Sequence, residues 1–201
     1  MLKSGNFFGI MRNKLQIRSY NKTIYEEAFT HRSLNIKNKN GRPLNFERLE
    51  FLGDSILSTI ITEYLYDFFP NSKEGELTKL RAKIVSRVKL NQIGKKMGLL
   101  ELAKISKNRR YFGDDIHGNL LESLIGAIFI DQGFKKTKKY VINNIINPFV
   151  DIRNLDNVVL SYKAFLIEWG QKEKKEIVFI TKEDIGKTTK INYTAKVLIN
   201  N

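Results

Sequence analysis

The chain has 201 residues, of which 42% are hydrophobic, so it can bury one sizeable core and a small appendage. It contains no cysteine and only two histidines, which excludes disulfides, thiol nucleophiles, thiolate zinc sites and histidine-rich metal sites. Any metal would therefore be a hard cation bound by oxygen atoms. The net charge of +14 favours a polyanionic partner, RNA or DNA before a membrane surface. No apolar stretch is long enough to span a membrane, and no secretory signal pattern is present.

The positive charge is concentrated in the first three quarters of the chain. Residues 1–150 contain 26 Lys and Arg against 14 Asp and Glu, a net charge of +12, whereas residues 151–201 contain 9 against 7, a net charge of +2. The larger part therefore carries most of the basic surface.

The predicted elements of the larger part are helical. Residues 1–20 form a loose basic arm, and a short amphipathic helix follows at residues 24–31. After a polar loop, a long helix runs from about residue 45 to Phe69 and is stopped by Pro70. One further long helix covers residues 77–94, and apolar periodicity predicts two more at residues 117–130 and 134–150. This pattern is typical of an all-α domain.

The pattern changes after Asp151. Residues 159–169 are predicted as a helix, and residues 176–181 and 190–198 as two strands of a hairpin. The expected organisation is an arm at 1–20, an all-α domain at 21–151, a linker at 152–158 and a small α+β unit at 159–201.

Three acids cluster on the long helix that starts near residue 45. At about 100° per residue, Glu47, Glu50 and Asp54 fall within roughly 60° of one another, away from the apolar face. Like charges at this spacing destabilise a helix. Folding does not require such an arrangement, whereas a hard metal cation does. Phe51 lies beside the acids, where a large aromatic side chain usually needs a partner surface.

A second acid lies among apolar residues on a distant helix. Glu122 would be costly to desolvate there unless it were paired or bound to metal. Asn119 shares its helix face, and Gly126 permits a close approach by a neighbouring helix. We therefore expect these groups to meet the Glu47 cluster. Such an oxygen-only set suits Mg²⁺ or Mn²⁺ and, in a basic protein, phosphodiester hydrolysis.

Other polar residues allow two interpretations from the sequence alone. Glu74 suits the first turn of a helix whether or not it has a function. His31 is interpreted as a hydrogen-bonded structural histidine. Arg32, Arg109 and Arg110 are either phosphate contacts or ordinary surface charges.

Four segments together resemble the ribonuclease III family of double-stranded-RNA-specific endoribonucleases, over residues 20–150. They are Asn-Phe-Glu-Arg-Leu-Glu-Phe-Leu-Gly-Asp-Ser-Ile-Leu at 45–57, Ala-Phe-Thr-His-Arg-Ser at 28–33, and the runs at 74–85 and 121–131. The resemblance implies a helical nuclease domain of the ribonuclease III fold that works as a homodimer, with a metal site in each subunit. Residues 159–198 resemble the first helix and two strands of a double-stranded-RNA-binding domain, and the chain ends before that domain's third strand and second helix.

The resemblance also implies residue roles. Glu50 and Glu122 match direct metal ligands, Asp54 matches the residue most closely tied to catalysis, and Glu47 completes the acidic site. Glu74 matches a further acid near the scissile phosphate, and Phe51 matches an aromatic that enters the other subunit. Asn119 stands where the family usually has Asp, so one negative charge is missing although an amide oxygen still binds a hard cation. Arg109, Arg110 and Lys163 are candidate RNA-binding residues.

The sequence thus predicts a Mg²⁺-dependent endoribonuclease that cuts double-stranded RNA, leaves 5′-phosphate and 3′-hydroxyl ends, and processes ribosomal and messenger RNA precursors. Mn²⁺ is expected to substitute for Mg²⁺, and no small-molecule cofactor or membrane is expected. The abundant Lys, Asn and Ile point to an AT-rich bacterial source and hence to the cytoplasm. Two alternatives remain, a non-catalytic double-stranded-RNA-binding or ribosome-associated protein of the same fold and a metal-dependent nuclease acting on DNA.

Overall fold

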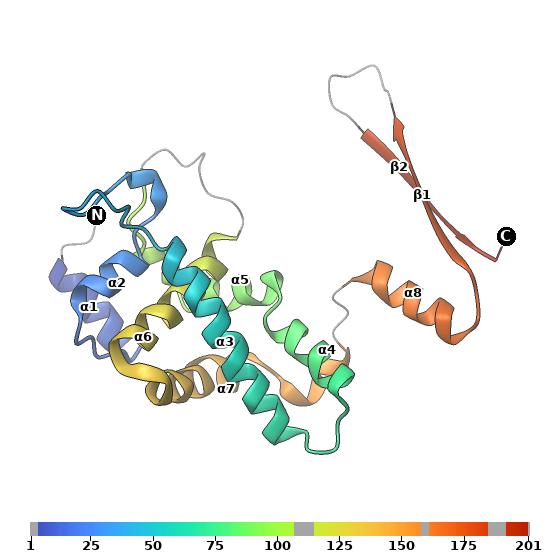
Figure 1. The fold of residues 1–201 in the computed structure, drawn as a ribbon, viewed down its shortest axis with the longest axis horizontal. Coiled ribbons are helices and arrows are strands. Elements are labelled where there is room, and N and C mark those ends of the chain that lie inside the picture. The colour runs from blue at the N-terminus through green and yellow to red at the C-terminus, as the bar shows by residue number, and fades with distance from the viewer. Residues whose placement is uncertain (1–3, 107–114, 158–160, 185–191, 201) are drawn as a thin grey trace. The chain divides into compact units, whose positions relative to one another are not determined.

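The computed structural model describes residues 4–106, 115–157, 161–184 and 192–200. The chain divides into two compact units, Met1–Asp156 and Asn157–Asn201. The first unit is helical and the second is a helix with a hairpin, so the predicted fold class is confirmed (Figure 1). Among the described residues, no helix has the length and apolar character needed to cross a membrane.

The helical unit contains α1 (Ser4–Asn13), α2 (Lys22–Ala28), α3 (Glu47–Phe68), α4 (Glu74–Ile84), α5 (Arg87–Lys96), α6 (Ile116–Val141) and α7 (Asn147–Phe149). Short 3₁₀ segments lie at Arg32–Leu34, Leu99–Leu102 and Ile152–Asn157, and a π-helical segment lies at Ile142–Ile146.

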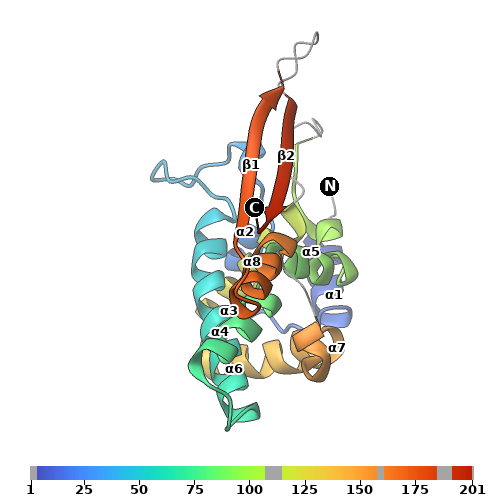
Figure 2. The same cartoon turned by 90° about the vertical axis from the view of Figure 1, so that its right-hand side faces the viewer.

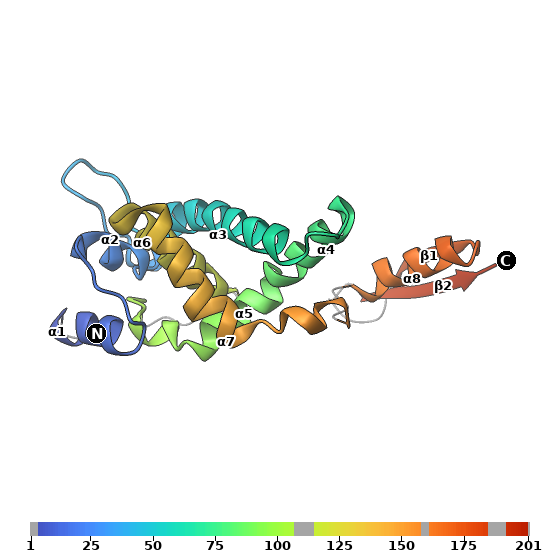
Figure 3. The same ribbon diagram turned by 90° about the horizontal axis from the view of Figure 1, so that it is seen from below.

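The unit is organised around the pairing of α3 with α6, which lie against each other (Figures 1 and 3). Two glycines allow their backbones to touch. A Cβ at Gly53 would overlap the backbone of Glu122, and a Cβ at Gly126 would overlap that of Leu49. The predicted close approach at Gly126 is therefore confirmed, and it brings the N-terminal half of α3 against the buried part of α6.

Residues 4–20 do not form the loose basic arm that the sequence predicts for residues 1–20. They form α1 and a following segment, and they bury Phe7, Met11, Leu15 and Ile17 in the core. Phe7 and Met11 are four residues apart, which places them on one face of α1, and Leu15 follows just beyond the end of that helix. The lack of acidic residues and the several Lys and Arg of this stretch favour a solvated arm, whereas its apolar side chains pack into the core.

The second long helix predicted from residue 77 is in fact two helices, α4 and α5. Ser86 lies between them with an extended backbone, and its hydroxyl accepts a hydrogen bond from the backbone N–H of Lys89 at 3.3 Å. This N-cap starts α5 afresh although the apolar spacing continues through it. The break places Arg87 at the first position of α5.

The start of α2 is fixed by Asp131 on α6. Its carboxylate accepts hydrogen bonds from the backbone N–H groups of Tyr20 and Asn21 at 3.0 and 2.6 Å, and from the Tyr25 hydroxyl at 3.0 Å. Further along α6, Gly133 adopts φ 76° and kinks the helix, close to the boundary predicted between residues 130 and 134. The kink at a residue without a side chain lets the last turns of α6 follow the core.

The second unit contains α8 (Tyr162–Lys172) and the antiparallel strands β1 (Ile177–Asp184) and β2 (Asn192–Ile199), which form the long ribbon in Figure 2. The register pairs Ile177 with Ile199 and Asp184 with Asn192. Helix α8 is capped by the Ser161 hydroxyl, which accepts from the N–H of Ala164 at 3.2 Å.

Candidate active site

A cleft of about 840 Å³ lies where α3, α5 and α6 meet, and its lining carries most of the predicted site residues. The acidic and amide residues of the lining are Glu47, Glu50, Asp54, Asp115, Asn119 and Glu122. The basic ones are His31, Arg32 and Arg87, and Phe46, Phe51, Val85, Leu90 and Ile116 supply the apolar wall. The expectation that Asn119 and Glu122 meet the acids of α3 is therefore confirmed.

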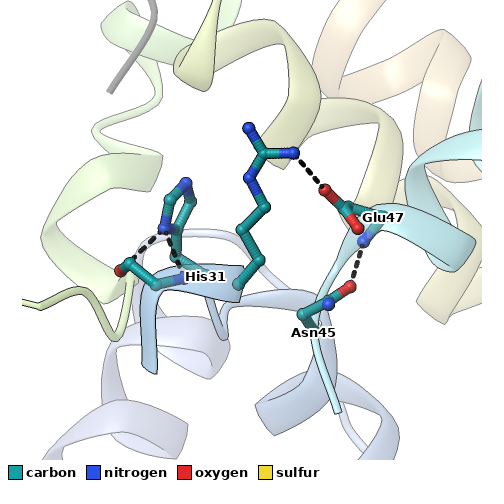
Figure 4. A network of polar contacts seen from close by, with 5 residues as sticks. His31, Asn45 and Glu47 are labelled. Carbon is teal, nitrogen blue, oxygen red and sulfur yellow. Dashed lines mark hydrogen bonds and ion pairs between the residues drawn. The ribbon is translucent and has the colours of Figure 1, made fainter. Parts of the chain in front are cut away.

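The acids of α3 are positioned by the way that helix begins. The Asn45 side-chain oxygen accepts a hydrogen bond from the backbone N–H of Glu47 at 3.0 Å, and Phe46 is buried at the helix start. Glu47 forms an ion pair with Arg32 at 3.0 Å (Figure 4). One turn later Glu50 is half-buried, and Asp54 follows one turn beyond it.

Glu122 is the buried acid of the cleft, with 5% of its surface exposed. Burial raises the pKa of Glu122 to about 7, and the nearby charges of Asp54 and Glu50 add to this effect while Arg87 opposes it. Burial also raises the pKa of Glu50. Burial is the main cause of both shifts, and the neighbouring carboxylates make a smaller contribution in the same direction.

Arg87 reaches across to α6. Its Nη1 donates a hydrogen bond to the Asn119 side-chain oxygen at 2.6 Å and lies 3.8 Å from Oε2 of Glu122. Its Nε lies 3.9 Å from Oδ2 of Asp115. A single guanidinium thus faces three oxygen-bearing side chains on one side of the cleft.

His31 is hydrogen-bonded, as the sequence predicted. Its Nδ1 accepts from the backbone N–H of Ser33 at 3.1 Å and lies 2.8 Å from the Ser33 hydroxyl (Figure 4). Burial, with the adjacent charge of Arg32, lowers the pKa of His31. The residue therefore holds the short helix that carries Arg32 at the edge of the cleft.

Four other predicted site residues either do not line the cleft or lie outside the residues that the structure describes. Glu74 is exposed at the start of α4 and accepts a hydrogen bond from Thr78 at 2.9 Å, but it does not line this cleft. Lys163 belongs to the second unit, where its Nζ lies 4.8 Å from the centre of the Phe179 ring. Arg109 and Arg110 lie outside the described residues. Phe51 lines the cleft while 79% of its surface is exposed.

Asp115 and Arg87 line the cleft but are not among the site residues predicted from the sequence. Asp115 precedes Asn119 by one helical turn, and that spacing was the available signal. Its carboxylate also accepts from the Asn91 amide at 3.0 Å. On one continuous helix over residues 77–94, Arg87 would lie on the solvent-facing side, and only the α4–α5 break brings it to the cleft.

The donor chemistry of the cleft suits a hard cation because every acidic or amide group in it offers oxygen. Within the part of the chain that the structure describes, however, no three acidic or histidine side chains stand close enough together to hold an ion as they are placed. The buried Glu122 meets Arg87 only at ion-pair distance.

Comparisons with known proteins identify the family of the chain. The family model described as ribonuclease-III-like matches residues 21–149. Ribonuclease 3 of Zunongwangia profunda is 46% identical over 98% of this chain and 82% of its own length. Ribonuclease 3 of Flavobacterium psychrophilum is 43% identical over 90% of this chain and 74% of its own length.

A solved structure gives the same result for the fold. The nuclease domain of ribonuclease III from Campylobacter jejuni, described as having a flexible region involved in dimer formation, is 31% identical with a TM-score of 0.61. The similarity covers 69% of this chain and 96% of that domain. The chain therefore belongs to the ribonuclease III family of endoribonucleases, and the resemblance of its four sequence segments is confirmed.

Proposed function

We propose that the protein is a Mg²⁺-dependent endoribonuclease that hydrolyses phosphodiester bonds in double-stranded RNA and leaves 5′-phosphate and 3′-hydroxyl ends. The observation that carries the proposal is the cleft in which Glu122 and Asn119 of α6 face Glu47, Glu50 and Asp54 of α3. Membership of the ribonuclease III family supports the same assignment.

Glu50, Asp54, Asn119 and Glu122 would hold the cation, since all four offer oxygen to one cleft. The raised pKa values of Glu122 and Glu50 support this role, because a bound cation would stabilise the ionised carboxylates that burial disfavours. When bound, the divalent cation would lower the pKa of water and stabilise negative charge on the leaving oxygen. We expect Mn²⁺ to substitute because it accepts the same oxygen ligands.

The chain's own residues have distinct tasks in this proposal. Asp54 and Glu122 orient the reacting groups from two helices whose contact at Gly53 and Gly126 leaves little freedom to move. Glu47 is oriented by Arg32 and by the capped start of α3. Glu74 acts near the scissile phosphate, as the family resemblance implies, from a position outside the cleft of its own chain.

RNA binding and dimerisation complete the proposal. The net charge of +12 in residues 1–150 supports contact with a phosphate backbone, with Arg109, Arg110 and Lys163 as candidate contacts. Duplex RNA would be recognised chiefly by its shape and its 2′-hydroxyl groups. The exposed ring of Phe51 supports a homodimer, and the related Campylobacter domain is described with a dimer-forming region. Precursors of ribosomal and messenger RNA in a bacterial cytoplasm are the proposed substrates.

Cleavage assays on three nucleic acids of the same sequence test the proposal. Duplex RNA, single-stranded RNA and duplex DNA would each be incubated with Mg²⁺, with Mn²⁺ and with a chelator. We expect cuts in duplex RNA alone, with either cation, and none with the chelator. Binding of duplex RNA without cleavage would instead identify the non-catalytic alternative, and cleavage of duplex DNA would identify the DNA nuclease.

A further inference from the structure

Arg87 is the positively charged side chain on the α6 side of the cleft. Of the basic residues that line the described cleft, Arg32 pairs with Glu47, and His31 is held by Ser33. Arg87 instead faces Asp115, Asn119 and Glu122. Half of its side chain is exposed, so it has room to turn towards solvent.

The position of Arg87 follows from the local fold. Ser86 ends the preceding segment and caps α5, so that Arg87 occupies the first turn of a new helix. The guanidinium lies in the cleft beside the oxygens of Asp115, Asn119 and Glu122. The short bond to Asn119, at 2.6 Å, fixes its orientation.

We propose that Arg87 is a built-in counter-cation that competes with the divalent cation for Glu122 and Asn119, and so sets the cation concentration at which the site fills. The inference rests on the proposed function, because it assumes that these residues hold the cation. A guanidinium and a divalent cation repel each other and are attracted by the same oxygens. By thermodynamic reciprocity, binding of either one weakens the binding of the other.

Asn119 has a matching role in this competition. A carboxylate at this position would form a charge-assisted pair with Arg87, which is stronger than a bond to a neutral amide. The amide oxygen therefore holds Arg87 in place while leaving it easier to displace. The neutral side chain of Asn119, where the family usually has Asp, therefore affects how easily a cation displaces Arg87.

The test measures cation binding directly, without activity. Titration calorimetry with Mn²⁺ on the full chain would compare wild type, Arg87→Gln and Lys96→Gln at about 0.1 M salt. Lys96 lies on the same helix, carries the same charge and does not line the cleft. We expect Arg87→Gln to bind Mn²⁺ roughly three- to tenfold more tightly, since one positive charge leaves the site. Lys96→Gln should differ from wild type by less than about twofold, because its charge is exposed and screened.

A second pair of variants isolates the competition from a change in folding. Arg87→Lys keeps the charge and should retain an affinity close to that of wild type. Asn119→Asp should increase Mn²⁺ affinity more in the Arg87→Gln background than alone, because Arg87 neutralises part of the added charge.

The outcomes separate this inference from the proposed function. If wild type binds Mn²⁺ and Arg87→Gln binds it equally or more weakly, the competition is wrong while the metal site stands. If neither wild type nor any variant binds Mn²⁺ at millimolar concentration, both the competition and the proposed function are wrong.

Discussion

The two units of the chain differ in how much they bury. In the helical unit, apolar side chains from α1 to α6 form a continuous core that includes Tyr25, Leu57 and Leu120. Among the residues of the second unit whose exposure is described, only Gly170 is buried. The large apolar side chains of Phe165 and Val197 are exposed. A side chain is held within a few tenths of an ångström only when its surroundings are packed. The comparison therefore assigns the chemistry to the helical unit.

The close contact between α3 and α6 is the feature of the helical unit whose disruption should cost the most stability. Gly53→Ala would push a Cβ into the backbone of Glu122, so the two helices would have to separate. We expect a loss of roughly 3 to 5 kcal/mol in the free energy of unfolding, measured by urea denaturation. Gly9→Ala in α1 is the matched control, because its Cβ meets nothing within 4 Å. That variant should be neutral or up to about 1 kcal/mol more stable, and equal effects at both sites would contradict the packing argument.

The helical unit also exposes Phe51, a large apolar side chain at the cleft that its own core does not bury. Phe51→Ala should leave the unfolding midpoint of the single chain nearly unchanged, since 79% of this residue is exposed. A buried aromatic anchor at an interface contributes about 2 kcal/mol or more. We therefore expect dimerisation to weaken roughly 30-fold, measured by sedimentation equilibrium. Tyr66→Ala, on the same helix and similarly exposed, serves as the control, and an unchanged dimer in Phe51→Ala would refute the interface.

Removal of the second unit tests whether the helical unit is independent. A chain ending at Asp156 keeps the core residues Ile152 and Leu155 and the bond from Lys83 to the Leu155 carbonyl. We expect its melting temperature to change by less than about 2 °C, because the removed residues contribute little burial. Duplex RNA affinity should fall by about tenfold as phosphate contacts are lost. A collapse of the melting temperature would mean that the core depends on the second unit.

The smallest effect is expected at Lys163, within the second unit. Its ammonium group lies over the Phe179 ring and is otherwise exposed, so Lys163→Gln removes one cation–π contact and one charge. We expect duplex RNA affinity to fall by about two- to threefold at 0.1 M salt, with a shallower salt dependence. Lys172→Gln on the same helix is the control, and an identical loss there would show that only net charge matters.

Much of the helical unit could be predicted from the sequence because its information is local. The acids of α3 repeat with the helical period, and Pro70 and Gly133 mark the ends of long apolar runs. The meeting of Glu122 with α3 could also be predicted, since an acid in an apolar helix needs a partner and Gly126 permits the approach.

The other features of the helical unit depend on contacts that the periodicity of apolar residues does not encode. The α4–α5 break depends on a single capping serine, within an apolar spacing that continues unchanged. Helix α1 contains one basic residue, Arg12, but the basic residues of the surrounding stretch favour a solvated arm, and the burial of Phe7 and Met11 in the core is a tertiary contact. The sequence does not place Arg87 in the cleft because it does not predict the break between α4 and α5. The proposed competition between Arg87 and a divalent cation therefore depends on the structure.

The cleavage of duplex RNA by Glu122→Gln tests the central claim most directly. This change keeps the size of the side chain but removes the buried carboxylate that faces the acids of α3. Asp67→Asn, on α3 but outside the cleft, is the matched control. We predict that Glu122→Gln lowers the cleavage rate in Mg²⁺ by at least about 10³-fold, as expected for loss of a group that acts in the transition state, while duplex RNA binding and the control's activity stay within about twofold of wild type. Undiminished cleavage by Glu122→Gln in Mg²⁺ would contradict the account.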